Sequence, residues 1–242
     1  MRLSGARVLV TGASSGIGAA TAREMARAGA RLVLVGRDRP RLDAVAAETG
    51  GRAVVGDLTA DAASLVSRTG PVDVLVNNAG AGWAGPLARM PGEAIERLAA
   101  VNLTAPILLT RLLLPGMIER GAGHVVFVAS IAGAVGVREE AVYSATKGGL
   151  IVFAEGLRHE LRDVGVSVVL PGVVDTPFFD RRGTPYARRR PRPIPPERVA
   201  RTIVSAIEQG RAECYVPGWL RLPSRLRGAA PGVFRALSGR FG

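Results

Sequence analysis

The stretch "ARVLVTGASSGIG" (residues 6–18) joins a short apolar run to a glycine-rich turn that opens a helix. The run is rich in valine and leucine, as expected of a buried strand. Gly12, Gly16 and Gly18 leave the backbone bare, and the first amides of a helix can bind the negative charge of a phosphate. Glycines also serve plain strand-to-helix turns, but this order of strand, turn and helix predicts a dinucleotide-binding loop.

Strand and helix patterns alternate along the chain that follows this loop. Further apolar strands are expected at 31–36, 52–57, 72–80, 124–130 and 166–172, with helices at 39–49, 60–69, 91–119 and 140–163. Uniformly apolar strands are typical of a parallel sheet that is covered on both faces. The alternation therefore predicts an α/β fold in a single domain, a doubly wound, mostly parallel, Rossmann-like sheet flanked by helices on both faces.

We divide this single domain into three parts. Residues 1–176 are expected to form the dinucleotide-binding and catalytic core. Residues 177–218 would supply a substrate loop, a helix and the last strand of the same domain. Residues 219–242 form a basic C-terminal segment.

The composition suits a globular protein with an unusual charge. The chain has 242 residues, of which 48% are hydrophobic, so it can bury a substantial core. Its formal net charge of +12 would suit a nucleic-acid-binding protein. The arginines are spread along the chain, however, and lack interleaved aromatic residues. We therefore expect no nucleic-acid partner and treat the two basic segments, 181–193 and 219–242, separately.

Three features bear on the compartment. Cys214 is the only cysteine, which suits a reducing environment. The first residues enter a strand at once and lack the apolar region of a signal peptide. Arg111 and Pro115 interrupt the longest apolar stretch, residues 105–118, so we expect no membrane-spanning helix. Together these features predict a cytoplasmic protein.

The end of the second strand indicates which nicotinamide cofactor binds. An acidic residue there would accept hydrogen bonds from ribose hydroxyls, whereas an arginine can pair with a 2′-phosphate. The strand ends with Gly36 and is followed by Arg37. Asp38 is the counter-argument, but we expect it to cap the next helix. The sequence predicts that NADP(H) is preferred over NAD(H).

The segment "YSATK" (residues 143–147) contains the only lysine among 32 basic residues. Tyr143 and Lys147 are four residues apart in a helical pattern, so they share one face. A free tyrosine has a pKa of about 10, which is high for acid–base catalysis near neutrality. A nearby ammonium should lower that pKa. Ser130, at the end of the strand 124–130, could hold a carbonyl oxygen beside this pair.

These residues together resemble the short-chain dehydrogenase/reductase family, in its compact form. The resemblance covers about residues 3–176 and includes 11–18, "NNAG" (77–80), Asn102, Ser130, the Tyr143–Lys147 pair and "PGVVDT" (171–176). It implies an oxidoreductase that transfers the pro-S hydride between NADP(H) and a carbonyl or alcohol, with Tyr143 as general acid/base. The catalytic set would be Asn102, Ser130, Tyr143 and Lys147, with Asn102 binding a water that links Lys147 to solvent.

The cofactor site expected from the loop and the resemblance extends over several segments. Asp57 and Leu58 would contact adenine, and Val174 and Thr176 would fix the nicotinamide carboxamide. The full set is Gly12, Ser14, Ser15, Gly16, Ile17, Gly18, Arg37, Asp57, Leu58, Asn78, Ala79, Gly80, Tyr143, Lys147, Pro171, Gly172, Val174 and Thr176. His124 and His159 have no acidic or cysteine cluster at ligand spacing, so both are interpreted as structural and no metal is expected.

Two alternatives to this function remain open from the sequence. A catalytically silent, cofactor-sensing regulator could use the same fold, although an intact catalytic set argues against it. A carrier-protein-linked β-ketoacyl reductase shares the upstream motifs, but such enzymes commonly end in a glycine-rich strand, where this chain has "AECYVPG" (212–218). The expected partners are a small-molecule carbonyl or alcohol and a second copy of the chain, in a dimer through the two long helices or in a tetramer.

The later basic segments are less informative. Phe178 and Phe179 suggest an apolar wall beside the substrate, and the arginines of 181–193 are interpreted as solvated charges, with an anionic substrate or carrier protein as the alternative. In 219–242, apolar residues alternate with arginines, and Pro223 and Pro231 should break any continuous helix. We expect this segment to pack on its own protein or a partner subunit, with contact to anionic lipid as the alternative.

Overall fold

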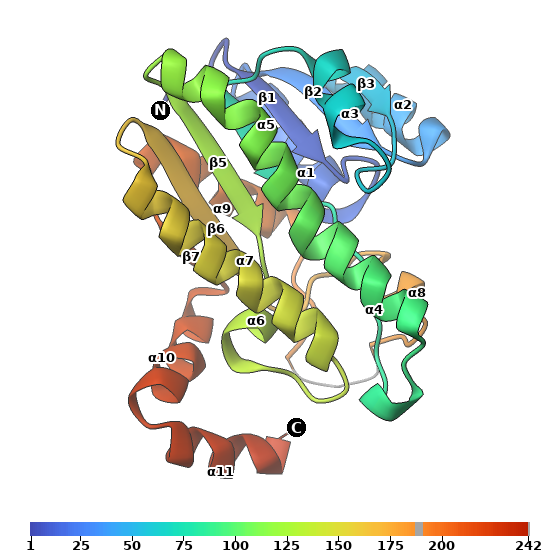
Figure 1. Ribbon diagram of the computed structural model, residues 1–242, viewed down its shortest axis with the longest axis vertical. Helices are drawn as coiled ribbons and strands as arrows, with labels where there is room; N and C mark the ends of the chain where they lie inside the picture. Colours follow the sequence, from blue (N-terminus) through green and yellow to red (C-terminus); the bar gives the residue numbers. More distant parts are fainter. Residues whose placement is uncertain (187–190, 242) are drawn as a thin grey trace.

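The chain folds around one parallel sheet. The computed structural model describes residues 1–186 and 191–241, with side chains described as far as residue 238. Among the described residues, seven strands pair in the order β3-β2-β1-β4-β5-β6-β7, so the order reverses between β1 and β4 (Figure 1). The strands are β1 (Arg7–Thr11), β2 (Arg31–Gly36), β3 (Arg52–Val55), β4 (Val74–Asn77), β5 (Gly123–Val128), β6 (Val164–Pro171) and β7 (Glu213–Val216). The doubly wound, single-domain fold expected from the sequence is confirmed.

Helices cover both faces of this sheet. They are α1 (Gly16–Arg27), α2 (Arg39–Thr49), α3 (Ala62–Thr69), α4 (Gly92–Ala99), α5 (Ala105–Glu119), α6 (Ile131–Val135), α7 (Ala141–Glu160), α8 (Phe178–Arg181), α9 (Pro196–Gln209), α10 (Arg221–Ala229) and α11 (Pro231–Phe241). The buried residues of α1, α2 and α9 pack on one face, and those of α3, α5 and α7 pack on the other. In Figure 1, α5 and α7 cross the front of the sheet.

The core follows from the alternation of side chains along each strand. In β1, Val8 and Val10 join the cluster under α1 and α9, whereas Leu9 joins the cluster under α3 and α5. Phe127 of β5 meets Phe153 of α7 edge-on, with ring centroids 5.6 Å apart. Burial on both faces explains why most positions in these strands are apolar.

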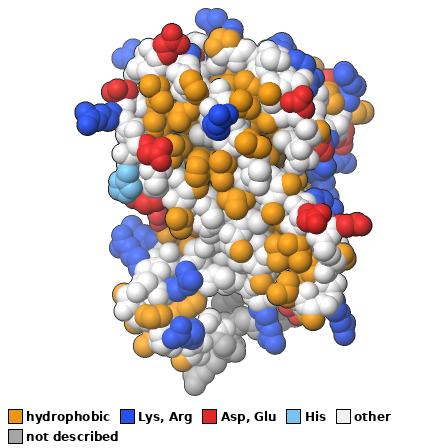
Figure 2. Space-filling model, in the orientation of Figure 1, with side chains coloured by type: hydrophobic (Ala, Val, Ile, Leu, Met, Phe, Trp, Pro, Cys, Tyr) orange, Lys and Arg blue, Asp and Glu red, His pale blue; other side chains and the backbone are white. Residues whose placement is uncertain are grey.

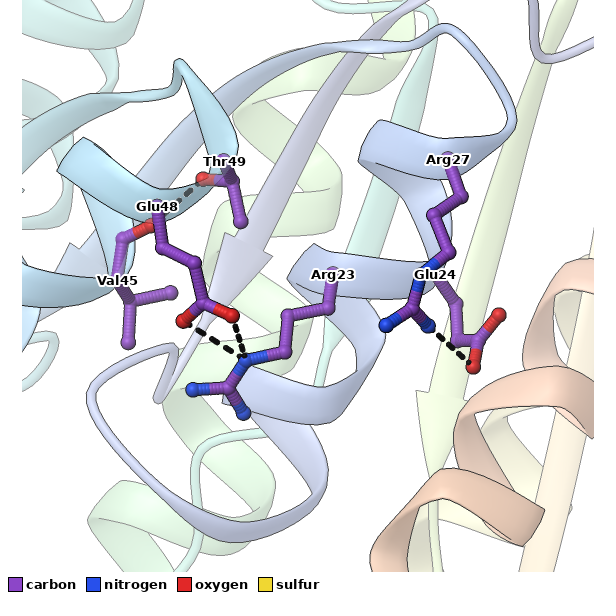
Figure 3. Close-up of polar contacts among 6 residues, drawn as sticks. All are labelled: Arg23, Glu24, Arg27, Val45, Glu48 and Thr49. Carbon is purple, nitrogen blue, oxygen red and sulfur yellow. Dashed lines mark hydrogen bonds and ion pairs between the residues drawn. The ribbon is translucent and has the colours of Figure 1, made fainter.

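One ion pair joins α1 to α2, and a second lies within α1 (Figure 3). The Arg23 Nε donates to both carboxylate oxygens of Glu48, at 2.8 and 2.9 Å, and Arg27 pairs with Glu24 one turn away on α1. All four side chains lie at the protein surface, where such pairs contribute little to stability. The apolar clusters beneath them therefore hold the helices on the sheet.

The helical stretch from Gly92 to Glu119 agrees with the helix expected at 91–119. A π-helical turn at Ala100–Thr104, which the sequence did not predict, joins α4 to α5, and α5 continues through both Arg111 and Pro115. Among the described residues it is the one helical stretch long and apolar enough to cross a membrane by length and composition. Core helices pass the same test, and Leu109 and Met117 of α5 are buried against the sheet.

The C-terminal segment packs on its own protein only in part. Helix α10 contacts α6, where Arg227 Nη1 donates to the carbonyl of Ala134 at 2.8 Å. Helix α11 packs on α10. The chain breaks between them before Pro231, as expected, whereas Pro223 lies within the first turn of α10, where its missing N–H costs no helical bond.

Close contact between α6 and α7 should make Gly133 sensitive to substitution. A Cβ at Gly133 would lie 2.5 Å from the carbonyl carbon of Lys147, whereas a Cβ at Gly156 on α7 would meet nothing within 4 Å. We expect Gly133→Ala to lower the free energy of unfolding by about 1–3 kcal/mol. Gly156→Ala should raise it by about 0.5–1 kcal/mol. Urea denaturation of both variants tests this, and equal effects of the two substitutions would contradict it.

Candidate active site

The glycine loop after β1 is shaped by close backbone approach. Gly12 has a φ of 66°, and a Cβ there would lie 2.9 Å from the Cα of Ala79. A Cβ at Gly18 would lie 2.2 Å from the carbonyl oxygen of Gly12. The loop therefore folds tightly against the end of β4 only because these positions carry no side chain.

Asn78 ties the loop to the point where the strand order reverses. Its Nδ2 donates to the carbonyl of Thr11 at 2.9 Å, and the backbone amides of Asn78 and Ala79 donate to Thr11 Oγ1 at 3.0 and 3.1 Å. These bonds join β1 to β4 at their carboxyl ends. In doubly wound sheets this is the position where ligands bind.

A cavity of about 920 Å³ opens at this edge of the sheet. It runs from Arg37 and Asp57 past the N-terminus of α1 to Ser130, Tyr143 and Lys147. Of the site residues expected from the sequence, all but two line it. Gly18 packs beneath the loop instead, and Asn102 lies below the cavity floor. A bare loop, helix amides and this volume fit a dinucleotide.

The far end of the cavity carries the residues expected to choose the cofactor. Asp38 caps α2, because its Oδ1 accepts from the Arg41 amide at 3.1 Å, which confirms the expected role. The Arg37 guanidinium is exposed and lies 3.6 Å from Asp57 Oδ2. A Cβ at Gly36 would lie 3.3–3.4 Å from side-chain atoms of Leu42 and Ser14, so a larger residue at this position would require these neighbours to shift. The Arg37 guanidinium can therefore bind an anion at the rim of the cavity, where the anion would compete with the Asp57 carboxylate.

Ser130 and Tyr143 meet at the opposite end of the cavity. Ser130 follows β5 by two residues and caps α6, where its Oγ accepts from the Ala132 amide at 3.1 Å. Its hydroxyl lies within hydrogen-bonding reach of the Tyr143 phenol. Tyr143 lies in the first turn of α7, and both side chains line the cavity. The expected pairing of these two hydroxyls is therefore present.

Lys147 lies one turn further along α7 and is 3% exposed. Its ammonium donates to the carbonyl of Val128 at 2.8 Å and lies 5.9 Å from the centroid of the Tyr143 ring. Within the described part of the chain, no carboxylate pairs with it. Burial lowers the pKa of Lys147 to about 8, because the desolvated ammonium is disfavoured.

The Tyr143 phenol does not follow the expectation from the sequence. Burial raises its pKa above the ordinary value, and its hydrogen bond with Ser130 opposes this shift only in part. The expected lowering by Lys147 is absent, because that ammonium is directed at Val128. In this structure the phenol therefore holds its proton at neutral pH, as a proton donor must.

Asn102 lies in the π-helical turn and braces the loop after β4. Its Oδ1 accepts from the Ala81 amide at 2.7 Å, and its Nδ2 donates to the Ala81 carbonyl at 2.9 Å and to Thr146 Oγ1 at 3.2 Å. Thr146 precedes Lys147 on α7. Asn102 thus joins the loop that carries Gly80 to the helix that carries the lysine.

The segment after β6 forms one wall of the cavity. Phe178 lies against Tyr143, with ring centroids 5.5 Å apart, which supports the expected apolar wall. Arg182, interpreted from the sequence as solvated, is only 8% exposed and forms an ion pair with Glu140 at the start of α7. The interpretation as a solvated charge was wrong for Arg182, because the chain after β6 folds back onto the start of α7. Residues 187–190 of the same basic segment lie outside the described residues.

The two histidines lie apart from the cavity. His124 is buried, and its Nε2 lies 2.8 Å from Ser167 Oγ. Burial lowers the pKa of His124 to about 4, so its ring is neutral at pH 7. Within residues 1–186 and 191–238, no group of three or more His, Cys, Asp or Glu side chains is arranged to hold a metal ion.

Sequence reasoning missed several charged residues around the cavity. Arg41, Arg97 and Arg181 line it, and no motif or spacing distinguishes them from other arginines. Their positions depend on how separate segments fold together.

Known proteins resemble this chain over most of its length. The short chain dehydrogenase family profile matches residues 6–186. Ketoacyl reductase HetN of a Nostoc species is 39% identical over 228 residues, which cover 88% of this chain and 79% of that protein. A Sphingobium yanoikuyae short-chain dehydrogenase in complex with NADPH has a TM-score of 0.83 and 31% identity, covering 97% and 93% of the two chains. A Burkholderia phymatum short-chain dehydrogenase/reductase in complex with NAD has a TM-score of 0.85 and 26% identity, covering 94% of each.

The buried lysine makes stability depend on pH. Below about pH 8 the folded protein keeps a desolvated ammonium, and above it folded Lys147 is neutral while the unfolded lysine, with a pKa of 10.5, stays charged. The unfolded state then binds more protons, so the free energy of unfolding should rise between about pH 8 and 10. Urea denaturation across this range measures the rise, and Lys147→Met, which removes the titrating group, is the control. A rise of the same size in that variant would contradict the assignment.

Proposed function

The chain belongs to the short-chain dehydrogenase/reductase family, and on that premise we propose that it transfers hydride between NADP(H) and a carbonyl or alcohol substrate. The observation that carries the proposal is the convergence of Ser130, Tyr143 and Lys147 at one end of a cavity whose middle is a dinucleotide loop. The preference for NADP(H) depends on Arg37 at the other end.

The reduction needs a proton at the carbonyl oxygen and a hydride at its carbon. Ser130 would hold the oxygen with its hydroxyl hydrogen, because its Oγ already accepts from Ala132. Tyr143 would give its proton to that oxygen as the alcohol forms. A bound nicotinamide would supply the hydride. Lys147 would stabilise the phenolate left on Tyr143 once its ammonium turns from the Val128 carbonyl toward the phenol oxygen, and the phenolate would then regain a proton from solvent.

The walls of the cavity indicate an apolar group beside the carbonyl. Phe178 covers Tyr143, and Phe179 lies edge-on to Phe178, with ring centroids 5.6 Å apart. Val137 and Ala84 line the same cavity. These side chains would exclude water from the reacting atoms and favour a substrate with an apolar substituent.

A second candidate is a β-ketoacyl reductase. The Nostoc relative is named as a ketoacyl reductase, which favours this substrate class. A 3-oxoacyl thioester carries an apolar chain that suits the same wall. Assaying 3-oxoacyl thioesters beside simple ketones, with both cofactors, separates the two candidates. The silent-regulator alternative is disfavoured because the full set of catalytic groups is present and three of them meet in the cavity.

The outward faces of α5 and α7 support an oligomer. Leu108, Ile118 and Val152 are exposed there, and Figure 2 shows hydrophobic side chains gathered across the face on which these helices lie. We propose that a second copy of the chain covers this face, either in a dimer or as part of a tetramer. The buried free thiol of Cys214 is consistent with a reducing compartment.

The catalytic assignment predicts the effect of two substitutions. Tyr143→Phe removes the proton donor but keeps the ring, so cofactor should still bind while kcat falls by roughly 10²–10⁴-fold. Lys147→Arg keeps the charge in a larger, planar group and should also lower kcat severely. Steady-state kinetics with a ketone substrate and fluorescence titration of the cofactor test both. Turnover close to that of the unmodified protein in Tyr143→Phe would refute the mechanism.

The cofactor assignment predicts a change in preference. NADPH should bind more tightly than NADH, and Arg37→Ala should remove that difference, because a lost charge-assisted pair costs about 1.5–3 kcal/mol. This corresponds to a preference of roughly tenfold or more. Titration of both cofactors measures it. Tighter binding of NADH to the unmodified protein would show that Asp57, not the phosphate, holds Arg37.

The oligomer proposal predicts that a charge on α7 separates the subunits. Val152 is 73% exposed, and burying a carboxylate in its place would be strongly unfavourable. We expect Val152→Glu to reduce the mass measured by light scattering, whereas Gly156→Ala on the same helix should not. An unmodified protein that is monomeric at micromolar concentration would refute the proposal.

A further inference from the structure

The segment from Phe178 to Tyr186 is attached to the protein at three separate points. Phe178 lies on Tyr143, and Arg182 pairs with Glu140 at the start of α7. The third point is on the other side of the cavity, where Arg181 Nη1 donates to Ser15 Oγ at 3.2 Å. The segment thus extends from the catalytic tyrosine to the glycine loop.

Ser15 occupies the place where the pyrophosphate is expected. It is the N-cap residue of α1, and its side chain makes no capping bond to the first turn of that helix. Ser15 and its neighbours Ser14, Gly16 and Ile17 line the cavity, and so does Arg181. The guanidinium of Arg181 therefore lies beside the N-terminus of α1.

Arg181 differs from Arg37 and Arg182, two other arginines that line this cavity. Arg37 lies near Asp57, and Arg182 is paired with Glu140. Within the described part of the chain, Arg181 forms no ion pair, and its bond to Ser15 is to a neutral hydroxyl. A positive charge held beside a phosphate-binding loop, with no carboxylate to neutralise it, suits an anion at that loop.

We propose that Arg181 binds the pyrophosphate of the cofactor from the substrate side of the cavity. The inference rests on the proposed function. A phosphate oxygen would replace Ser15 Oγ as the acceptor, and the charge-assisted bond would be stronger than the present one. Cofactor binding would then strengthen the attachment of residues 178–186 to the glycine loop and hold this segment in place across the cavity.

The two arginines make opposite predictions for fragments of the cofactor. ADP carries the diphosphate without a 2′-phosphate, and adenosine 2′-monophosphate carries only the 2′-phosphate. Arg181→Ala should weaken NADPH, NADH and ADP by roughly tenfold or more, and leave adenosine 2′-monophosphate within about twofold. Arg37→Ala should weaken NADPH and adenosine 2′-monophosphate and leave ADP unchanged.

Calorimetric titration of the full chain measures these affinities. Arg192→Ala is the matched control, since it removes the same charge from the basic stretch 181–193 at a position that does not line the cavity. ADP affinity within twofold of the unmodified protein in Arg181→Ala would overturn the proposal. Equal weakening of all ligands in Arg181→Ala and Arg192→Ala would also overturn it, as a general charge effect. An unmodified protein that binds neither NADH nor NADPH would refute the proposed function itself.

Hydrogen exchange tests the fastening of the segment. NADPH should slow exchange in peptides covering 178–186 in the unmodified protein and have little effect on them in Arg181→Ala at saturating cofactor. Equal protection in both proteins would show that Arg181 does not fasten the segment.

The C-terminal helix pair supports a second, independent inference. Leu222, Val233 and Leu237 are exposed on it, and Trp219 is exposed in the turn just before it. None of the described residues of this segment lines the cavity, so it is no flap over the substrate. Residues 219–242 contain five arginines and no Asp or Glu. Apolar side chains among positive charges suit an anionic lipid surface. The same segment of a second copy would carry the same five arginines and would be repelled.

We propose that α10 and α11 bind anionic membranes peripherally. The pair lies at the same end of the sheet as the carboxyl end of β5 (Figure 1). The full-length protein should sediment with vesicles containing phosphatidylglycerol and not with pure phosphatidylcholine. The double substitution Val233→Asp and Leu237→Asp should abolish this, whereas Val152→Asp on α7 should not. Absence of sedimentation with anionic vesicles would refute the proposal, as would a dimer that dissociates in the α11 variant.

Discussion

The buried ammonium of Lys147 constrains the whole catalytic end of the molecule. It has lost its hydration and gains one backbone carbonyl, that of Val128 at 2.8 Å. Reaching that carbonyl requires α7 to touch α6 at Gly133, where no side chain fits. A desolvated charge with so little compensation destabilises the fold. The carboxyl end of β5, the short helix α6 and Gly133 together hold the Lys147 ammonium in a buried position, where its charge is unfavourable.

The same lack of water sets the protonation of both reacting groups. Burial lowers the pKa of Lys147 and raises that of Tyr143, so the neutral form of each group is favoured. Within the proposed mechanism this keeps the proton on the phenol until the substrate oxygen takes it. The ammonium then faces a phenolate about one helical turn away, and its charge is needed at that moment and not before.

Local patterns predicted the fold and most of the cavity, because strands, glycine turns and the Asp38 cap depend on neighbouring residues. What the sequence did not predict depends on distant contacts. Arg182 and Glu140 are 42 residues apart, and nothing in a run of arginines indicates which one folds back into a buried pair. The pKa of Tyr143 depends on how fully α7 and Phe178 enclose the ring.

The π-helical turn at Asn102 also fixes the phase of α5. Such a turn holds about one residue more than an α-helical turn, and each residue advances a helix by roughly 100°. Removing one residue from Ala100–Thr104 would therefore rotate everything downstream by that angle. Leu109 and Met117 would leave the sheet, and neighbouring residues now in solvent would take their places. The irregular turn thus sets the angular register between the side chain that braces the catalytic lysine and the helix face that closes the core.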